Sequence, residues 1–374
     1  MSSTKKSILI LTPFFHPNIG GVETHLLDLC QQLDQKSYSF TVLTFTPLST
    51  NLKAKLKESF GHHGTIIRFS YVGHNLFHRL EKYPLLNFLY LSPYLFLRSF
   101  FYLLTHSKPD IIHSHGLAAA FTAFFLQKIF SFQKHIVSIY SNYDNVPLNN
   151  FYFKIFTWVL NHSQAVLTQS NQSLQKLSQL GVHQHLLHRY YHWIDLNTFK
   201  PSHRKNKKFT CLFVGRMIPA KNTLMVAKLA RYFPQINFDF IGTGPDFNSL
   251  QLFTNKYSNI HLLGDISYTD LPLYYSRSHL LLVPSKYQEG WGRIIAESIA
   301  CATPVIASNL GATTEAANTD VTIFIRPTLK NFSTHLQKLS KHQSLYHQMQ
   351  KKCRPYALRH YSSRNATYIF THYQ

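Results

Sequence analysis

Two carboxylate residues enclose a glycine-containing segment in the last third of the chain. Glu289 and Glu297 stand on either side of Gly290 and Gly292, and a helix-like apolar run begins at Ile294. Glycines at a helix start leave backbone N–H groups open to a ligand, and the helix dipole favours an anion there. The pattern predicts a phosphate at this helix start, with the two carboxylates around a larger polar ligand. The alternative is one loop glutamate and one helix-surface glutamate, both solvated.

Three further turns place glycines or cations directly after strand-like apolar runs. Gly20 and Gly21 follow the first such run, Arg216 and Lys221 follow a later one, and a third turn reads Ile241-Gly-Thr-Gly-Pro245. Backbone amides of a glycine pair can approach a phosphate, Arg offers its oxygens a planar fork, and Lys offers a point charge. Each feature taken alone is also compatible with a tight turn or a solvated surface cation.

The size and composition of the chain indicate two folded domains. Its 374 residues exceed what one hydrophobic core normally holds, and a hydrophobic fraction of 45% is enough for two cores. Lys and Arg outnumber Asp and Glu by 38 to 16, which gives a formal net charge of +22. Such a surface attracts polyanions, so phosphorylated ligands, anionic lipid headgroups and nucleic acid are all candidate partners.

Short apolar runs alternate with helix-length segments along the whole chain, which is the pattern of parallel α/β units. The predicted strands of the first half are residues 7–12, 39–45, 65–69, 111–113, 135–140 and 165–168. Those of the second half are residues 209–214, 238–241, 260–263, 280–283, 305–307 and 322–325. The polar, basic residues 200–208 separate the two series and have the composition of a linker. We therefore expect an α/β protein with two doubly wound domains, residues 1–199 and 200–353, that bind ligand in a cleft at the carboxyl ends of their strands.

Two segments and the cysteine content bear on where the protein works. Residues 7–13 are predicted to be a buried strand and not a secretory signal, because the apolar run is short and no small-residue cleavage site follows. The four cysteines contain no C-x-x-C pair, which indicates reduced thiols in a cytoplasmic protein. Residues 84–104 are rich in Leu, Phe and Tyr, but Asn87, Pro93 and Arg98 interrupt them, so a buried or interfacial helix is expected in place of a spanning one.

Taken in order, these motifs resemble the retaining glycosyltransferases of family 4, also called group 1 glycosyltransferases. The matching residues are Gly20-Gly-Val-Glu23, Pro109-Asp-Ile-Ile-His-Ser-His-Gly116, Phe213-Val-Gly-Arg216 with Lys221, Ile241-Gly-Thr-Gly-Pro245, and Pro284-Ser285 with residues 289–304. The resemblance covers nearly the whole chain and is densest between Cys211 and Thr314. It implies the GT-B architecture, which has two Rossmann-like domains facing a central cleft and a C-terminal helix, here residues 354–374, that crosses back to the first domain.

The resemblance also implies roles for individual residues. A nucleotide-diphosphate sugar would bind mainly to the C-terminal domain, where Arg216 and Lys221 stabilise the leaving diphosphate and Glu289 contacts the donor sugar, these three forming the catalytic group. Glu297 would accept hydrogen bonds from the ribose hydroxyls. The other implied donor-binding residues are Gly20, Gly21, Gly290, Trp291, Gly292 and Arg293. The nucleotide sugar is a co-substrate in this scheme, so no cofactor and no divalent metal are expected.

One position departs from the family pattern. Many members carry a histidine just after the strand that is predicted here at residues 135–140, where this chain has Tyr140. His115 and Asp144 are candidates for an acceptor or proton-transfer role in its place. The histidines between residues 183 and 192 lack the spacing of a zinc site, so no metal ion is expected there.

The sequence thus predicts a hexose-transferring, retaining glycosyltransferase whose acceptor is a glycan or a lipid-linked molecule. Cell-envelope or surface-polysaccharide synthesis is the expected setting, in the cytoplasm and at the inner face of the membrane, where the basic residues would contact anionic lipid. One alternative is a GT-B epimerase or phosphorylase, which would share the phosphate site. Another is a nucleic-acid-binding protein, but the chain has no recognition-helix, RRM or zinc-finger signature, and no nucleic-acid partner is expected.

Overall fold

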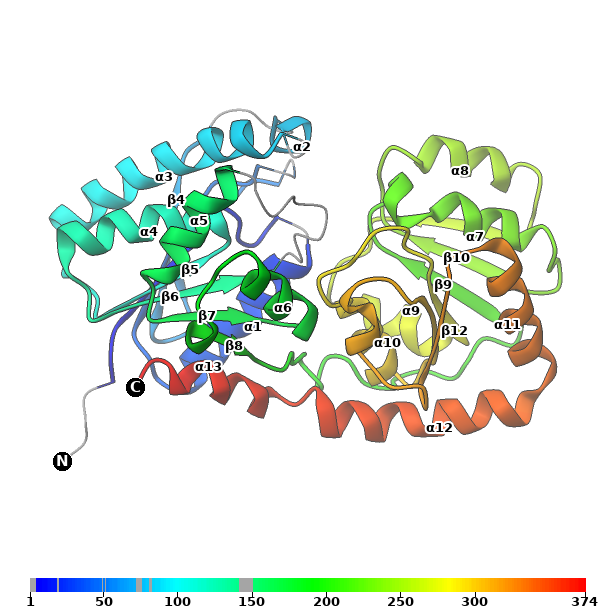
Figure 1. Cartoon of the computed structure of the whole chain (residues 1–374). Helices are drawn as coiled ribbons and strands as arrows, with labels where there is room; N and C mark the ends of the chain where they lie inside the picture. Colours follow the sequence, from blue (N-terminus) through cyan, green and yellow to red (C-terminus); the bar gives the residue numbers. More distant parts are fainter. Residues whose placement is uncertain are drawn as a thin grey trace. The chain divides into compact units, whose positions relative to one another are not determined.

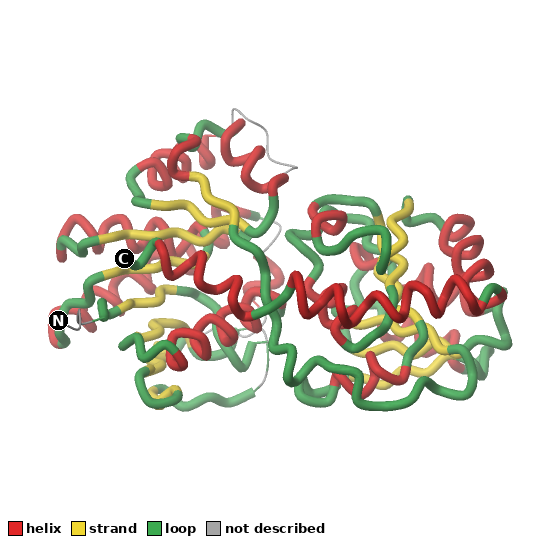
Figure 2. Tube along the Cα trace, turned by 90° about the horizontal axis from the view of Figure 1, so that it is seen from below, coloured by secondary structure: helices red, strands yellow, loops and turns green. Residues whose placement is uncertain are grey.

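The computed structural model describes residues 5–18, 20–48, 50, 52–71, 76–80, 83–140 and 151–374. The chain divides into two compact units (Figure 1): unit 1 is Met1–His192 with Ser363–Gln374, and unit 2 is Trp193–Ser362. Each unit has its own sheet, and Figure 2 shows the strands in yellow with helices in red around them. Each unit is described by itself below.

Within the described residues, unit 1 holds one sheet in the order β3-β4-β2-β1-β5-β6-β7-β8. Its strands are β1 (Ile8–Leu11), β2 (Phe40–Phe45), β3 (Lys57–Phe60), β4 (Gly64–Phe69), β5 (Ile111–His115), β6 (Lys134–Ile139), β7 (Ala165–Thr168) and β8 (Leu187–Arg189). All neighbours run parallel except β3, which pairs antiparallel with β4. The first strand of the chain, β1, therefore lies inside the sheet, and the chain leaves it for β2 on one side and later returns for β5 on the other.

Helices cover both faces of the first sheet. They are α1 (Gly21–Gln35), α2 (Leu76–Leu80), α3 (Pro84–Thr105), α4 (Leu117–Phe130), α5 (Phe151–Asn161), α6 (Asn171–Gln179), η1 (Gln184–Leu186), η4 (Ser363–Ala366) and α13 (Thr367–Thr371). Leu9 and Leu11 pack in a core cluster with residues of α3 and α4. The alternate side chains, Ile8 and Ile10, are buried as well. A strand covered on both faces has to be apolar throughout, which is why β1 reads Ile-Leu-Ile-Leu.

Unit 2 repeats this plan with a smaller sheet. In this fully described unit the strand order is β11-β10-β9-β12-β13-β14, and all pairs are parallel. The strands are β9 (Thr210–Val214), β10 (Asn237–Ile241), β11 (Ile260–Gly264), β12 (Leu280–Val283), β13 (Val305–Ser308) and β14 (Thr322–Ile325). The helices are η2 (Pro219–Lys221), α7 (Thr223–Ala230), α8 (Phe247–Thr254), α9 (Leu271–Arg277), α10 (Arg293–Ala300), η3 (Ala312–Glu315), α11 (Leu329–Lys341) and α12 (Gln343–His360).

Alternate residues of β9 enter two separate cores. Leu212 and Val214 pack with α10 and α12, whereas Cys211 and Phe213 pack with α7 and α11. Period-two alternation thus distributes one apolar strand between two helical layers. The prediction of two parallel α/β sheets is confirmed.

The twelve predicted strands all have counterparts, but β3 and β8 were not predicted. Both are short edge strands. In β3 the side chains alternate between exposed and half-buried, and β8 carries the half-buried His188 and Arg189. An edge strand with one solvated side needs no continuous apolar run, so the sequence carries little signal for it.

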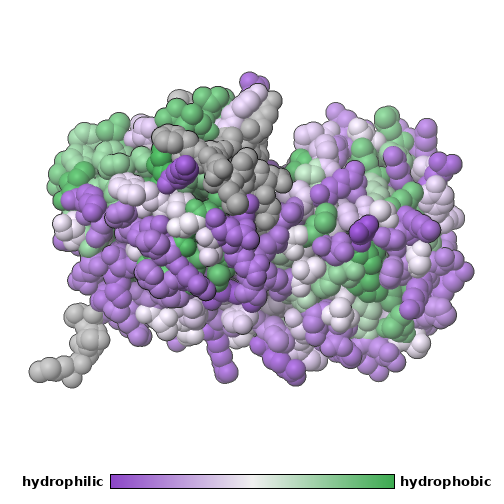
Figure 3. Space-filling model, viewed as in Figure 1, coloured by the Kyte–Doolittle hydropathy of each residue, from purple (hydrophilic) through white to green (hydrophobic). Residues whose placement is uncertain are grey.

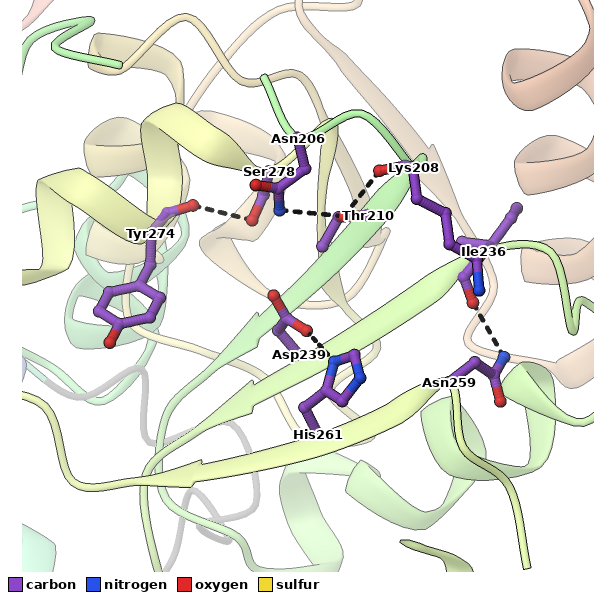
Figure 4. Close-up of polar contacts among 9 residues, drawn as sticks. All are labelled: Asn206, Lys208, Thr210, Ile236, Asp239, Asn259, His261, Tyr274 and Ser278. Atoms are coloured by element: carbon purple, nitrogen blue, oxygen red, sulfur yellow. Dashed lines mark hydrogen bonds and ion pairs between the residues drawn. The ribbon is translucent and has the colours of Figure 1, made fainter. Parts of the chain in front are cut away.

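Unit 2 begins earlier than the sequence-based boundary at residue 200. Ile194 and Phe199 precede that boundary, yet they are 1% and 0% exposed and lie in the core of unit 2. The basic segment that follows is bound to the same unit, as Figure 4 shows. The Asn206 side-chain amide donates to Thr210 Oγ1 at 3.1 Å, and the Thr210 hydroxyl donates to the Lys208 carbonyl at 2.9 Å. Polar residues here make hydrogen bonds at the start of β9, a central strand of the sheet.

The last residues of the chain belong to unit 1. Ile369 and Phe370 of α13 are buried, and the Tyr373 hydroxyl lies 2.7 Å from Nδ1 of His113 on β5. The C-terminal aromatic residues of this segment therefore serve largely as core of unit 1, with Tyr368 more exposed at 38%.

Buried histidines predict acid sensitivity of the fold. His135 is fully buried beside the Ser114 hydroxyl, and burial lowers its pKa from 6.5 to about 3. The folded state thus stays neutral at this position while the unfolded chain takes up a proton below pH 6.5. Its contribution to stability is complete above that value and is lost as the pH falls toward 3. From about pH 7 to about pH 5, the free energy of unfolding of the wild type should fall by about 2 kcal/mol more than that of His135→Asn. Urea unfolding at the two pH values measures both.

The control is His203→Asn, because His203 is exposed. This variant should lose stability with falling pH as the wild type does. Equal losses for the wild type and His135→Asn would refute the buried-proton explanation.

Candidate functional site

The polar residues singled out by sequence follow the two central strands of unit 2. In this sheet β9 comes first in the chain and has β10 on one side and β12 on the other. The chain leaves β9 and β12 toward opposite sides of the sheet, and the carboxyl ends of two such strands are where open α/β sheets bind ligands. Arg216 and Lys221 follow β9, and Glu289 follows β12.

Lys221 and Glu289 meet across this crossover. Lys221 ends η2, and its Nζ lies 2.8 Å from Glu289 Oε1, which also accepts a hydrogen bond from the Ser285 hydroxyl. The two side chains are only 14% and 8% exposed. Burial lowers the pKa of Lys221, but the Glu289 carboxylate and Tyr287 together raise it by more, so the net shift is upward. The lysine is held as a cation at a fixed place.

Tyr287 interacts with both residues of the Lys221–Glu289 pair and with the charge of Arg216. The Lys221 ammonium lies 5.2 Å from the centre of the Tyr287 ring. Burial and Glu289 raise the pKa of Tyr287, while Lys221 and Arg216 oppose that rise. Arg216 is exposed, and its positive charge favours a lower pKa of the same tyrosine. No described carboxylate forms an ion pair with Arg216 within 4 Å.

The third glycine turn supports the Arg216 loop. A Cβ on Gly242 would lie 2.1 Å from the Gly215 carbonyl oxygen, and one on Gly244 would lie 2.5 Å from that of Met217. Both glycines also have positive φ, at 120° and 148°. Only glycine allows the two loops to approach this closely. These glycines therefore position the backbone around Arg216, a role that the sequence pattern did not distinguish from phosphate binding.

Helix α10 begins at the glycine turn between the two glutamates. Gly292 precedes the first helical residue with φ of 92°, a left-handed conformation that favours glycine. Trp291 beside it is 6% exposed and packs edge-on against the Tyr361 ring, with centroids 5.7 Å apart. Gly290 stands half-buried before it. The buried Trp291 therefore anchors the turn. The backbone amides at the start of α10 can then bind an anion.

Arg293 and Glu297 form a buried pair on α10. Arg293 Nε donates to Glu297 Oε1 at 2.9 Å, and the Tyr275 hydroxyl donates to Oε2 at 3.0 Å. A second guanidinium nitrogen of Arg293 donates to the Tyr268 hydroxyl at 2.7 Å. Arg293 and Glu297 are 8% and 3% exposed. Within unit 2 this pair holds the carboxylate that sequence reasoning assigned to the ribose.

The predicted residues of unit 1 follow its own crossover strands. Gly20 and Gly21 open α1 after β1, and His115 ends β5. A Cβ on Gly21 would meet no atom within 4 Å, whereas one on Gly20 would meet the Glu23 carboxylate. Gly20 has φ of 176°, an extended conformation open to any residue.

His115 pairs with the tyrosine that departs from the family pattern. Its Nδ1 lies 2.6 Å from the Tyr140 hydroxyl, and the two rings are stacked with centroids 5.9 Å apart. Burial, with a smaller effect from His25, holds the pKa of His115 well below its usual value. The imidazole is therefore neutral near pH 7. Asp144, the other proton-transfer candidate, lies outside the described residues.

Several side chains at these sites were not predicted. Ser285 stands in a quoted motif, but nothing in its spacing indicated a contact with Glu289. Tyr268 and Tyr275 come from segments well before α10 and carry no local signal. Among the described residues, no group of three or more His, Cys, Asp or Glu side chains has the arrangement of a metal site.

Family comparisons agree with the order of these motifs. A family described as "Glycosyl transferases group 1" matches residues 195–356, and one described as "Glycosyltransferase Family 4" matches residues 19–198. A human phosphatidylinositol N-acetylglucosaminyltransferase component is 23% identical to this chain over 350 residues, which cover 89% of this chain and 68% of that protein.

Solved structures share the fold of the whole chain. Sucrose-phosphate synthase from Thermosynechococcus elongatus has a TM-score of 0.83 at 17% identity, covering 99% of this chain and 98% of that one. Anabaena HepE, solved in complex with UDP and glucose, has a TM-score of 0.76 at 16% identity, covering 99% of both chains. Similarity at this level of identity shows the fold, which is of the GT-B type.

The buried Lys221–Glu289 pair predicts strong coupling. Glu289→Gln leaves a nearly buried ammonium without its carboxylate, and the free energy of unfolding should fall by about 3 kcal/mol. The double variant Lys221→Met/Glu289→Gln should lose less than the sum of the two single variants, because it removes both charges. Urea unfolding of all four proteins at neutral pH measures this. Additive losses would contradict an energetic coupling between the two residues.

Proposed function

The chain belongs to the group 1 glycosyltransferases of family 4, and we propose that it transfers a hexose-type sugar, with retention, from a nucleotide-diphosphate sugar to a glycan or lipid-linked acceptor. The observation that carries the proposal is the meeting of Lys221, Tyr287 and Glu289 beside Arg216 at the carboxyl ends of β9 and β12. Transfer from a nucleotide sugar is the activity of the family. The sugar, the stereochemistry and the acceptor are the proposal.

Arg216 and Lys221 provide the charge that a leaving diphosphate requires. The Arg216 guanidinium is exposed and offers a planar fork to phosphate oxygens. The Lys221 ammonium has three donors, of which Glu289 and Tyr287 engage two, so the third can point to the diphosphate. Negative charge grows on the diphosphate as the glycosidic bond breaks, and cations already in place stabilise it without rearrangement. The amides at the start of α10 add further donors.

The two glutamates supply acceptors for hydroxyl groups. Glu289 is oriented by Lys221 and Ser285, which suits it to hold the hydroxyls of the donor sugar. Glu297 is oriented by Arg293 and Tyr275, and an ionised carboxylate has about four acceptor positions for its hydrogen bonds. Ribose hydroxyls would add to the bonds that Glu297 already makes. In this proposal no metal ion takes part.

His115 would act as a neutral hydrogen-bonding group. Its pKa lies well below the usual value because it is buried, and Tyr140 occupies its Nδ1. A neutral imidazole so oriented suits hydrogen bonding to an acceptor hydroxyl, and its low pKa leaves a donor phosphate oxygen as the proposed base. The acceptor is proposed to be lipid-linked because the similar human protein acts, by its name, on phosphatidylinositol. A cytoplasmic protein that builds cell-envelope or surface polysaccharide is the proposed setting.

Thermal stabilisation by nucleotide sugars tests the donor site. UDP-glucose, GDP-mannose and ADP-glucose are compared, with UDP-glucose first because HepE binds UDP and glucose. A ligand at about 100 times its Kd adds about 2.7 kcal/mol to the stability of the folded state, which raises Tm by several degrees. Arg216→Ala should weaken the effective donor about tenfold or more, because a charge-assisted hydrogen bond to phosphate is lost.

The matched control is Arg231→Ala, an exposed arginine of the same unit. It should keep the full Tm shift. Stabilisation by one donor class that Arg216→Ala removes supports the assignment. Absence of a shift with every donor, or equal shifts for both variants, would contradict it. Turnover of the donor to an epimer, or phosphate-dependent cleavage of a glycan, would favour the epimerase or phosphorylase alternative.

A further inference from the structure

Helix α3 exposes a row of large apolar side chains. Leu85, Leu89, Leu97 and Phe101 stand at multiples of four residues and are 56%, 54%, 50% and 61% exposed. With 3.6 residues per turn, these four positions spread over about half of the helix surface, and that half is exposed. A surface helix of a soluble domain normally places polar residues on that side. Packing in the core of unit 1 therefore does not explain why these exposed side chains are apolar.

The opposite side of α3 belongs to that core. Leu91, Leu95 and Leu103 are buried in the cluster that contains β1 and α4, and Ser92 Oγ donates to the Ala118 carbonyl at 3.3 Å. By length and composition, Leu85–Thr105 could cross a bilayer, yet crossing would pull these leucines out of the core. Such a helix can present only its outer side to lipid.

The apolar row continues onto the neighbouring helices. Phe125 and Ile129 of α4 are 40% and 53% exposed, and Trp158 of α5 is 49% exposed. The Phe96 and Phe125 rings lie 6.4 Å apart, and Phe124 contacts Trp158 with centroids 4.7 Å apart. Figure 3 shows the apolar residues gathered over α3 in the upper left. These exposed residues of α3, α4 and α5 are called the apolar face below.

Within helices α3, α4 and α5, the charged side chains have a single sign. Helices α3, α4 and α5 contain Arg98, Lys128 and Lys154, all exposed, and no Asp or Glu. Lys128 lies over the Phe124 ring at 5.5 Å and Arg98 over the Phe69 ring at 5.2 Å. Long cationic side chains can cover apolar surface while their charges reach a polar layer. The face therefore combines apolar anchors with cations at its margin.

The positive charges favour an anionic membrane over a second copy of the chain as the partner that covers the apolar face. In a symmetric dimer the same patch meets itself, so each cation would be brought toward the like charges of the second copy. An anionic lipid surface is complementary to both the apolar row and the cations. We propose that unit 1 docks on anionic membranes through the apolar face, with α3 lying in the plane of the headgroups. The proposal deepens the proposed function, since docking brings the protein to a lipid-linked acceptor.

Binding to vesicles measures docking without any donor or acceptor. The full-length protein is mixed with phosphatidylcholine vesicles that contain or lack about 30 mol% phosphatidylglycerol, and the bound fraction is measured by flotation. We expect binding to the anionic vesicles that weakens with salt. Trp158 gives a local signal, because Trp193 and Trp291 are 1% and 6% exposed. Its fluorescence should shift to the blue on binding, and Trp158→Phe should remove the shift.

Two pairs of variants separate the apolar from the electrostatic contribution. Leu97→Ser/Phe101→Ser should weaken vesicle binding about tenfold or more, through loss of buried apolar area. Its control, Leu252→Ser/Leu358→Ser, changes two leucines of unit 2 that are 65% and 53% exposed. Lys128→Glu/Lys154→Glu should weaken binding to a similar extent. Its control, Lys228→Glu/Lys256→Glu, makes the same change of net charge on unit 2.

The outcomes distinguish the occupants. Loss of binding in the two α3–α5 variants, with both controls unaffected, supports docking. Equal binding by a variant and its matched control overturns it, as does failure of the wild type to bind anionic vesicles. A wild-type dimer that the Leu97→Ser/Phe101→Ser variant converts to a monomer, without vesicle binding, would assign the face to a second copy. Donor stabilisation should be the same in all these folded variants, so failure of docking does not affect the donor assignment.

Discussion

In each sheet, the central strands contact helices on both faces, and this constraint decides where polar chemistry can occur. Leu212 and Val214 enter one core while Cys211 and Phe213 enter the other, so β9 has no side chain left for a ligand. Polar groups are confined to the loops beyond the strand ends. There Arg216, Lys221 and Glu289 follow two strands that lie side by side, and the chemistry of unit 2 depends on that adjacency.

The side chains of the candidate site in unit 2 are held in place by contacts within the protein. Lys221 and Glu289 are separated by 68 residues in sequence, yet they form a nearly buried ion pair. Arg293 and Glu297 form another on α10, with tyrosine hydroxyls on both partners. Buried charges are costly unless they are paired and hydrogen-bonded, and here each pair also fixes a carboxylate in one orientation. Such preorganisation is what electrostatic stabilisation of a leaving group requires.

Helix α3 carries apolar side chains on two sides, of which one is buried and the other exposed. Its inner leucines complete the core of unit 1, and its outer leucines and phenylalanines stay in contact with solvent. A net charge of +22 on only 14% charged residues leaves broad surface without carboxylates, and helices α3 to α5 are one such region. The combination is unusual for an isolated soluble surface and suits contact with an anionic layer.

By itself, the sequence determined the two-sheet α/β architecture, because strands buried on both faces must be apolar throughout and therefore stand out from the helices between them. It missed β3 and β8, whose solvated edges impose no such pattern. It also singled out candidate residues that the structure places directly after β9 and β12, since glycine and charge after a strand are local signals. Only the tertiary structure paired Lys221 with Glu289 and Ser285, His115 with Tyr140, and Gly242 with the Gly215 carbonyl. These contacts join distant segments, and their geometry arises from strand order and packing, which no local spacing encodes.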